Sequence, residues 1–317
     1  MQNNSVSILY QDHYLLILNK PAGIVVHPTY KHTEGDTLWD ALLADTSLQV
    51  DDWLPEELPD EPQWAGAPPD IQQMLRQKRT AQMWKEDGLL QHPCLLHRLD
   101  KDTSGVIALA RTERARRFIA KQFRNHTIEK RYLAVVRIGA PEWAIPRGPL
   151  SVTRYHVDGS VEGVSLPTSD ALETSGDDTL EINGPLWRDL DDRRRCIVTE
   201  DGQESVTRVR VLAQTDGFIL LDVRPLTGRT HQIRAHLAAF GYSIVGDQVY
   251  ASPVQPETPE SMLHRQFLHA ASLSMRRYPG NAPCTFVAPL ADDLVAWMKQ
   301  YFPTGLGVID ASTVPAQ

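Results

Sequence analysis

Two strand-like runs that meet at a tight turn constrain the fold more than any other feature of this sequence. The runs SVTRVRVLAQT and GFILLDVRPLTG, within residues 205–228, are rich in β-favouring residues, and Asp216-Gly217 stands at their junction. An Asp-Gly pair between two such runs is a strong signal for a β-hairpin. Since a hairpin pairs its strands antiparallel, the sequence predicts that this part of the chain lies in an antiparallel sheet.

Similar short runs recur along the chain and indicate an α+β fold. Strand-like runs flank a polar turn at Gln11–His13 and return in VIALA, RYLAVV and FLHAASLSM. Helices are predicted from about Glu113 to Phe123 with Thr112 as its cap, over RTHQIRAHLAAF with its end at Gly241, and over LADDLVAWMKQYF. Because hairpins outnumber βαβ patterns, we expect a largely antiparallel mixed sheet flanked by helices and loops.

Two acidic stretches interrupt this pattern, at about residues 44–90 and 140–204. Both are irregular, and structureless loops of that length are uncommon inside a compact domain. We therefore interpret them as insertions in a single domain that spans residues 1–303, because the strand-rich blocks on either side of each insertion need one another to complete a sheet. The tail at residues 304–317 is expected to be loose.

Charge is distributed unevenly along the chain. The net charge is −8, but residues 45–70 and 161–204 contribute −8 each, so the remaining residues carry +8. Residues 111–137 contain nine Lys or Arg and two Glu. Because the local pattern of charge matters more than its sum, this basic segment is compatible with a nucleic-acid partner although the whole chain is acidic.

Several classes of protein are disfavoured by the sequence. No apolar run approaches the roughly 20 residues of a membrane helix, and the start lacks the features of a secretory signal. The three cysteines are widely spaced, as in a reduced cytoplasmic protein. No Gly-rich phosphate motif is present, and His231 and His236 are five positions apart, so a helix does not place them on one face as metal ligands. We expect a cytoplasmic protein with no membrane segment, no metal and no small-molecule cofactor.

The stretch HRLDKDTSGV, residues 97–106, offers a candidate catalytic carboxylate in Asp100. An Asp beside a turn commonly caps that turn, whereas a working carboxylate in a closed pocket needs a nearby cation to stay ionised. The stretch TGRTHQIRAH supplies Arg229 and Arg234, which lie about 140° apart on a helix, so that they cannot both face the same spot. Tyr132, in KRYLAVV, is equally compatible with core packing and with stacking on a nucleobase.

Several of these motifs, in this order, resemble the RluA-type pseudouridine synthases. The resemblance rests on ILYQDHYLLILNKPAGIVVHP, LLHRLDKDTSGVIALART, KRYLAVV, RPLTGRTHQIRAHLAAFGYSIVGDQVY and FLHAASLSM. It covers residues 6–29, 95–138 and 205–290 and does not cover the two acidic stretches. It implies the pseudouridine synthase fold with a catalytic cleft across the sheet, no N-terminal S4 domain, and isomerisation of uridine in RNA without a metal or a cofactor.

The resemblance implies roles for the residues that match the family's motifs. Asp100 is expected to be the essential carboxylate, which acts on the ribose either by attack at C1′ or by removal of the C2′ proton. Tyr132 matches the tyrosine that stacks on the base, and Arg234 matches the arginine that pairs with the carboxylate. Arg98 is expected to enter the RNA where the target nucleotide has flipped out, which offsets part of the cost of extrusion. The other expected RNA-binding residues are His97, Arg116, Arg117, Lys121, Arg124, Lys130, Arg131 and Arg229.

Two functions from different classes are compatible with the sequence. The first is an RNA pseudouridine synthase, an isomerase that acts as a monomer on 23S ribosomal RNA, tRNA or both. The second is a non-catalytic RNA-binding protein that retains the fold, and a metal-dependent nuclease is a distant third. The intact set of Asp100, Tyr132 and Arg234 favours the isomerase. The acidic stretches are either solvated insertions without a role in RNA binding, or segments that border the RNA channel and restrict which RNA enters.

Overall fold

A computed structural model of the chain describes residues 6–26, 37–38, 40, 64–86, 88–164, 171–172, 177–215, 217–252 and 258–312. They form two compact units. Unit 1 comprises the described residues up to Lys101 together with Val106–Ile128 and Ser274–Phe286. Unit 2 comprises Asp102–Gly105, Glu129–Leu273 and the described residues from Val287 onward. Both units take segments from distant parts of the chain. The single domain expected over residues 1–303 remains a prediction.

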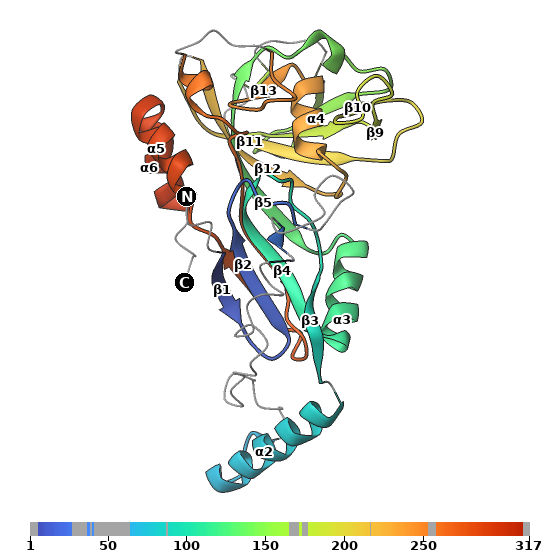
Figure 1. Ribbon diagram of the computed structural model, residues 1–317, viewed down its shortest axis with the longest axis vertical. Coiled ribbons are helices and arrows are strands. Elements are labelled where there is room, and N and C mark those ends of the chain that lie inside the picture. The colour runs from blue at the N-terminus through green and yellow to red at the C-terminus, as the bar shows by residue number, and fades with distance from the viewer. Residues whose placement is uncertain are drawn as a thin grey trace. The chain divides into compact units, whose positions relative to one another are not determined.

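The described residues of unit 1 form strands together with the helices α2 and α3 (Figure 1). Its elements are β1 (Ser7–Gln11), β2 (Leu15–Lys20), α2 (Pro69–Glu86), β3 (Leu89–Leu95), most of β4 (Ser104–Thr112), α3 (Glu113–Arg124), the end of β14 (Leu268–Arg276) and most of β15 (Pro283–Val287). The strands follow the order β1-β2-β4-β14, β3 pairs with β4, and β15 pairs with β14. The pairs β1–β2 and β3–β4 are antiparallel.

The first hairpin of unit 1 confirms the polar turn expected at Gln11–His13. The Asp12 carboxylate accepts hydrogen bonds from the backbone N–H groups of Tyr14 and Leu15, both at 2.7 Å, and from the Tyr10 hydroxyl at 2.7 Å. An aspartate that binds its own backbone in this way stabilises a turn, which fixes where β1 ends and β2 begins.

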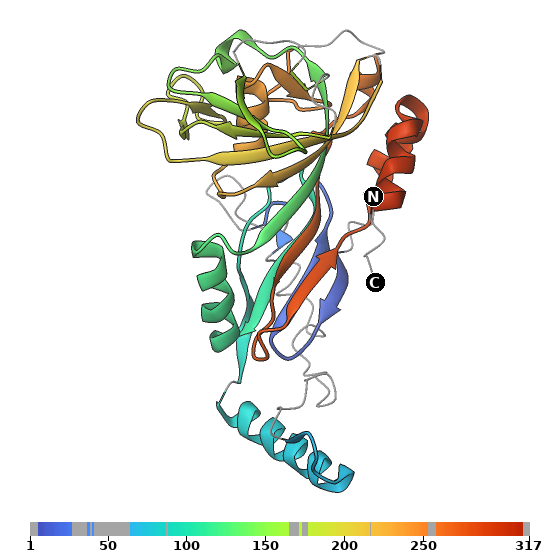
Figure 2. The same ribbon diagram turned by 180° about the vertical axis from the view of Figure 1, so that it is seen from behind.

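The predicted basic helix of unit 1 is α3, which runs beside β3 in both views (Figures 1 and 2). Its N-cap is Thr112, as expected, and the Thr112 hydroxyl accepts a hydrogen bond from the backbone N–H of Ala115 at 3.3 Å. Ala115 and Ile119 are buried on the inner face of the helix. The helical period therefore leaves its Arg and Lys side chains on the outer face.

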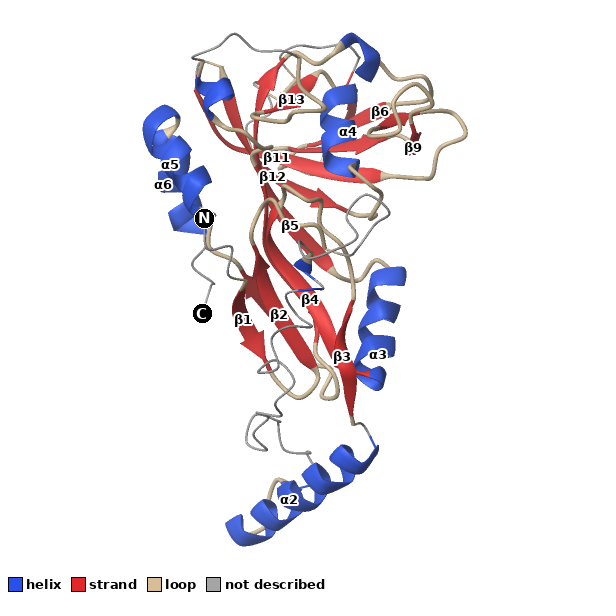
Figure 3. Cartoon of the chain, viewed as in Figure 1, coloured by secondary structure: helices blue, strands red, loops and turns tan. Residues whose placement is uncertain are grey.

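Unit 2 combines a strand-rich sheet with helices (Figure 3). Its elements are β5 (Glu129–Ile138), β6 (Ser151–Tyr155), β7 (Val161–Val164), β8 (Thr179–Asn183), β9 (Leu186–Arg188), β10 (Cys196–Val198), β11 (Val206–Thr215), β12 (Phe218–Pro225), α4 (Gln232–Ala239), β13 (Tyr242–Ile244), α5 (Asp292–Tyr301) and α6 (Pro303–Ser312), with short 3-10 helices at Glu142–Ala144 and Pro259–Met262. The strands follow the order β14-β5-β12-β11-β8-β6-β7, β13 pairs with β5, and β9 and β10 form a separate two-stranded sheet.

The hairpin predicted within residues 205–228 is β11–β12. Its strands pair antiparallel from Thr207–Pro225 to Thr215–Phe218. β12 is buried along almost its whole length and packs in a core that includes Leu221, Leu237 of α4 and Trp297 of α5. The sheet pairs are mainly antiparallel, with a parallel pair between β4 and β14, which confirms the α+β fold class.

Two segments differ from the expectations drawn from sequence. Residues 140–204 were expected to be irregular, but they supply β6 to β10, and β8 pairs with β11. In β8 the apolar residues Leu180 and Ile182 point toward the core, while Glu181 between them points to the other face, so that the strand contributes only two apolar residues to the pattern. The tail was expected to be loose after Pro303, but it forms α6, because Pro303 suits a first helical position and Ile309 is buried.

Candidate active site

Asp100 lies in unit 1, half-buried in the loop that follows β3. A buried cation holds this loop in place. The Lys20 side chain is fully buried, and its Nζ donates hydrogen bonds to the backbone carbonyls of Pro21 at 2.8 Å, Ile24 at 3.0 Å and Lys101 at 2.8 Å. The backbone N–H of Gly23 also donates to the Lys101 carbonyl, at 3.0 Å. The NKPAG segment therefore anchors the residue that follows Asp100.

Lys20 is a positioning residue that reasoning from sequence missed. The available signal was a lysine at the end of an apolar strand, since a buried ammonium must find hydrogen-bond acceptors nearby. Its three carbonyl partners satisfy the three donors of the ammonium group. The arrangement fixes the backbone of the Asp100 loop through the Lys101 carbonyl.

Of the other residues of the HRLD motif, His97 and Leu99 pack within unit 1 and Arg98 lies at the surface. The Nε2 of His97 accepts a hydrogen bond from the backbone N–H of Ala108 at 3.1 Å, and its ring lies 5.1 Å from the ring of Phe123. Leu99 is buried, whereas the Arg98 side chain is exposed. His97 thus ties the loop to β4 and α3, and Arg98 is directed to solvent.

The Thr-Ser-Gly turn after Asp100 belongs to unit 2 and joins β4 to β14. Gly105 has a φ of +114°, and a Cβ at this position would lie 2.2 Å from the Ala270 carbonyl oxygen, so no other residue fits without displacement. The Ser104 hydroxyl lies 3.0 Å from Nδ1 of His269, which is fully buried. Burial lowers the pKa of His269 to about 4. The turn is therefore explained by strand packing and not by phosphate binding.

Arg234 lies on α4 in unit 2 and forms a buried ion pair that the sequence analysis did not identify. Its Nε and Nη2 atoms donate to the two carboxylate oxygens of Asp247 at 2.7 and 2.8 Å. Burial alone would raise the pKa of Asp247, but the hydrogen bonds and the charge of Arg234 outweigh it and hold that pKa below its usual value. The guanidinium also lies 4.8 Å from the centre of the Tyr250 ring. Asp247 and Tyr250 thus orient Arg234.

The other polar residues of TGRTHQIRAH hold the start of α4 in place. The Gln232 side chain accepts hydrogen bonds from the Thr227 hydroxyl at 2.7 Å and the Arg229 backbone N–H at 3.0 Å. His236 is fully buried, with Nδ1 2.9 Å from the Thr207 hydroxyl and Nε2 2.9 Å from the Gly184 carbonyl. Burial lowers the pKa of His236 to about 4, so the ring is neutral at pH 7. These contacts assign structural roles to Gln232 and His236.

The first residues of β5 are held by contacts within unit 2. Tyr132 is half-buried, lies opposite Val223 in the β5–β12 pair and packs against the core of unit 2. The Lys130 ammonium donates to the Thr227 carbonyl at 2.6 Å, and burial lowers its pKa to about 8. Arg131 lies 3.1 Å from the buried carboxylate of Asp222. Lys130 and Arg131 therefore also serve the fold of unit 2.

The predicted RNA-binding residues of α3 differ in their surroundings. Arg116 and Arg117 both pair with Glu113, at 2.6 and 2.7 Å. Their hydrogen bonds, that of Arg116 first, lower the pKa of Glu113 to about 2. Lys121 and Arg124 lie in the last turn and are exposed. The helix thus presents cations to solvent, some of them already bound to a carboxylate.

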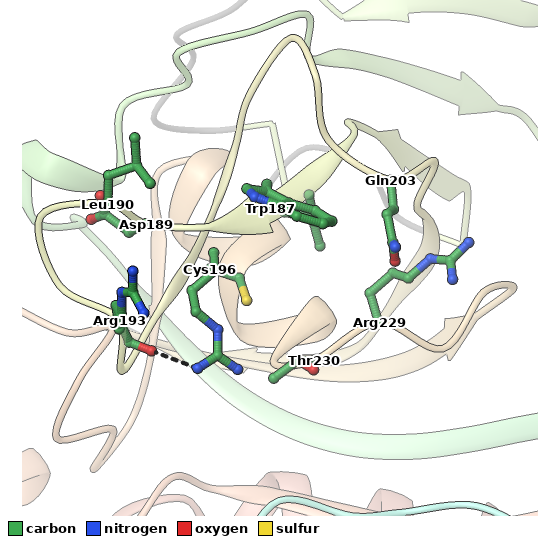
Figure 4. A pocket seen from close by; sticks show the side chains of 10 residues that line it. Trp187, Asp189, Leu190, Arg193, Cys196, Gln203, Arg229 and Thr230 are labelled. Carbon is green, nitrogen blue, oxygen red and sulfur yellow. Dashed lines mark hydrogen bonds between the residues drawn. The ribbon is translucent and has the colours of Figure 1, made fainter.

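Arg229, just before α4, lines a pocket of about 330 Å³ in unit 2 (Figure 4). The other lining residues come mainly from β9, β10 and the turn between them, and they include Trp187 and Arg193. The Arg229 Nε donates to the Glu204 carbonyl at 3.2 Å. A motif residue therefore meets the second acidic stretch at this pocket.

The predicted catalytic residues fall in different units: Asp100 in unit 1, and Tyr132 and Arg234 in unit 2. The pairing of Asp100 with Arg234, and a shared cleft across the sheet, remain predictions. Among the described residues, no group of three His, Cys, Asp or Glu side chains is placed to hold a metal ion. No helix within the described ranges is both long and apolar enough to cross a membrane.

An α+β fold with these motifs defines the class of protein. The family of RNA pseudouridylate synthases matches residues 14–239, a span that includes Asp100, Tyr132 and Arg234. The chain therefore belongs to the RNA pseudouridylate synthases, a family of RNA-modifying isomerases, and the resemblance to RluA-type enzymes is confirmed.

Individual relatives agree with this assignment. The chain is 33% identical over 282 residues to an "Uncharacterized RNA pseudouridine synthase" of Chloroflexus aurantiacus, a match that covers 89% of this chain and 65% of that protein. It is 28% identical over 303 residues to "Ribosomal large subunit pseudouridine synthase D" of Zymomonas mobilis, which covers 94% and 73%. The solved structure "Human RNA Pseudouridylate Synthase Domain Containing 4" shares the fold, with a TM-score of 0.52, 21% identity and coverage of 93% and 92%.

Proposed function

We propose that this chain isomerises uridine to pseudouridine in RNA, with Asp100 as the essential carboxylate. The observation that carries the proposal is the family match over residues 14–239, which includes the HRLD, KRYLAVV and GRTHQIR motifs. Asp100 acts on the ribose, either by attack at C1′ or by removal of the C2′ proton. The N1–C1′ bond then breaks, the uracil rotates, and C5 joins the sugar. Tyr132 stacks on the base.

The buried Arg234–Asp247 pair supports the role proposed for Arg234. The pair engages Nε and Nη2 of the guanidinium and fixes the orientation of the side chain that we propose to bind the Asp100 carboxylate. A guanidinium beside a carboxylate in a water-poor pocket keeps that carboxylate ionised. An arginine that is already oriented by a buried partner loses little further freedom when it binds.

Exposure of Arg98 supports a role in base flipping. A uridine stacked in RNA hides its glycosidic bond, and its extrusion costs a few kcal/mol. Arg98 follows the anchored ring of His97 and is exposed, which suits a side chain that fills the gap left by the nucleotide. The exposed cations Lys121 and Arg124 suit backbone phosphates.

We propose ribosomal RNA of the large subunit as the substrate, with tRNA as the alternative. Relatives such as the one from Zymomonas mobilis are named as large-subunit ribosomal enzymes. We propose further that the protein acts in the cytoplasm, as a monomer, and needs RNA as its sole partner.

The test compares wild type with Asp100→Asn on total RNA from cells that lack the gene. Pseudouridine is mapped by carbodiimide reactivity, and RNA binding and thermal unfolding are measured on the same preparations. We expect the variant to fold and to bind RNA like wild type but to form no pseudouridine. Isomerisation by the variant would refute the role of Asp100, and RNA binding without isomerisation by wild type would favour the non-catalytic alternative.

A further inference from the structure

The β9–β10 turn and the residues before α4 form a basic pocket with an exposed aromatic ring. Its volume is about 330 Å³, within the range of small-ligand pockets. In the view of Figure 4, Trp187 lies in the middle of the lining, with Arg193 to one side and Gln203 and Arg229 to the other. Asp100, Tyr132 and Arg234 are not among the residues that line it.

Strand geometry explains why Trp187 faces outward. Successive side chains of a strand point to opposite faces, and in β9 the preceding residue, Leu186, packs inward with Val198 against Ala235 and Ala238 of α4. Trp187 therefore points away from that core, and 51% of its surface is exposed. Ile197, which lies opposite Trp187 in the β9–β10 pair, is buried, whereas about half of the Trp187 surface stays open to solvent. A large aromatic side chain left at the surface is a feature that ligand-binding and nucleic-acid surfaces share.

The acidic residues of the β9–β10 turn are already neutralised by other arginines. Asp189, the acidic residue among those lining the pocket, pairs with Arg195 at 2.6 Å and also lies 3.5 Å from Arg147. Asp191 pairs with Arg147 at 3.0 Å. Asp192 pairs with Arg194 at 2.6 Å. The negative charge of this turn is therefore matched locally and does not oppose an anion in the pocket.

Three further guanidinium groups line the pocket, those of Arg188, Arg193 and Arg229. In the described part of the chain, none of the three has a carboxylate partner. The side-chain hydrogen bonds of Arg188 and Arg229 go to the backbone carbonyls of Arg193 at 3.3 Å and of Glu204 at 3.2 Å. The pocket therefore keeps a net positive charge within an acidic stretch of sequence.

We infer that this pocket binds an unpaired nucleotide of the RNA substrate, with its base stacked on Trp187 and its phosphates held by Arg188, Arg193 and Arg229. An aromatic face combined with arginines is the arrangement that binds single-stranded nucleic acid without reading its sequence. The inference rests on the proposed function for the identity of the RNA. It gives the second acidic stretch a role in holding the strand, since Arg229 and Thr230 of the GRTHQIR motif complete the pocket.

The test measures binding of a single-stranded oligouridine hexamer to the full chain, with matched variants. Arg193→Gln removes a pocket cation, and Arg194→Gln removes a neighbouring cation that is paired with Asp192 outside the pocket lining. Trp187→Leu removes the ring, and Trp187→Phe keeps an aromatic face. We expect Trp187→Leu to weaken binding roughly tenfold and Trp187→Phe to restore most of it. Arg193→Gln should weaken binding and lower the salt slope by about 0.7, whereas Arg194→Gln should leave both unchanged.

Binding of an RNA duplex of the same length is measured as a second comparison, because its bases are stacked in the helix and are not available to Trp187. Trp187→Leu should not change duplex binding, and an equal loss on both RNAs would contradict base stacking. Equal hexamer affinity for wild type, Trp187→Leu and Arg193→Gln would overturn the inference.

Pseudouridine formation by wild type is measured in parallel. If wild type modifies RNA while the pocket variants bind the hexamer normally, the pocket inference fails alone. If wild type modifies no RNA while the pocket variants lose binding, the proposed function fails alone.

Discussion

The ammonium of Lys20 lies 2.8 Å from the backbone carbonyl oxygen of Lys101, the residue that follows Asp100. The contact joins residues 81 positions apart and is one of three carbonyl contacts made by a fully buried cation. It places a long-range constraint on the loop that carries the proposed catalytic carboxylate.

Replacement of Lys20 by Met should therefore impair both stability and catalysis. The variant removes a donor from the backbone carbonyls of Pro21, Ile24 and Lys101, and, as far as the described ranges extend, only that of Lys101 keeps a hydrogen bond, from the Gly23 N–H. A buried acceptor left unsatisfied costs about 1–3 kcal/mol. We expect a lower free energy of unfolding in urea, and a fall in kcat larger than the change in KM, because the loop loses its anchor and not its RNA contacts. Lys101→Met, which alters an exposed side chain in the same loop, should have little effect on either quantity. A Lys20→Met variant with wild-type kcat would show that the anchor does not position Asp100.

Removal of the charge on Asp247 should destabilise unit 2 strongly. Asp247→Asn leaves the buried guanidinium of Arg234 without its counter-charge, at a cost of about 3–5 kcal/mol. Asp293→Asn is the matched control: Asp293 also binds an arginine, Arg265, through two oxygens, but its side chain is 50% exposed. Because the site of Asp293 is open to water, solvent can compensate for the lost carboxylate charge, and we expect a smaller loss of unfolding free energy. Similar losses in the two variants would contradict the effect of burial.

The Arg234–Asp247 pair also predicts acid sensitivity. The native pKa of Asp247 lies below that of an unfolded aspartate, which is about 3.9. The stabilisation is therefore fully present above about pH 4 and is lost as the pH falls through the lowered native pKa. Urea unfolding of wild type at a series of pH values should show this loss, and Asp247→Asn should lack it.

Two buried histidines predict a second loss of stability, which begins at a higher pH. Burial lowers the pKa of both His236 and His269 to about 4, below the value of about 6.5 in an unfolded chain. The unfolded state therefore binds more protons between these values. Each histidine should lower the free energy of unfolding by about 1.4 kcal/mol per pH unit as the pH falls from 6.5 to 4. The slope of unfolding free energy against pH should become shallower in His236→Gln and stay unchanged in the exposed control His264→Gln.

RNA binding should depend on the ionisation of Lys130. Burial lowers its pKa to about 8, so the side chain loses most of its charge between pH 7 and 9. If Lys130 contacts a phosphate as predicted, affinity for RNA should fall over this range. Lys130→Arg should bind with less dependence on pH because an arginine stays charged. Lys121→Arg, on the exposed face of α3, should keep the wild-type pH dependence, and a flat wild-type profile would exclude Lys130 from the RNA contact.

Much of the fold was predictable because its signals are local. The hairpins at Gln11–His13 and within residues 205–228 follow from turn chemistry and strand propensity, and α3 follows from its period and from Thr112 at its cap. β8 was missed because only one face of this short strand is buried, and its two apolar residues, Leu180 and Ile182, flank a charged Glu181. α6 was missed because its helical state depends on burial of Ile309 against a core assembled from distant segments.

The sequence alone was enough to identify the family and to select Asp100, Tyr132 and Arg234 as candidate catalytic residues, because each lies in a motif of adjacent residues. Folding was needed to find the partners of these residues. Lys20 contacts a carbonyl 81 positions away, and Asp247, beyond β13, pairs with Arg234 of α4. Trp187 is exposed because Leu186 faces α4. Burial and long-range contact set the energy of each of these interactions, and neither is encoded in the spacing of neighbouring residues.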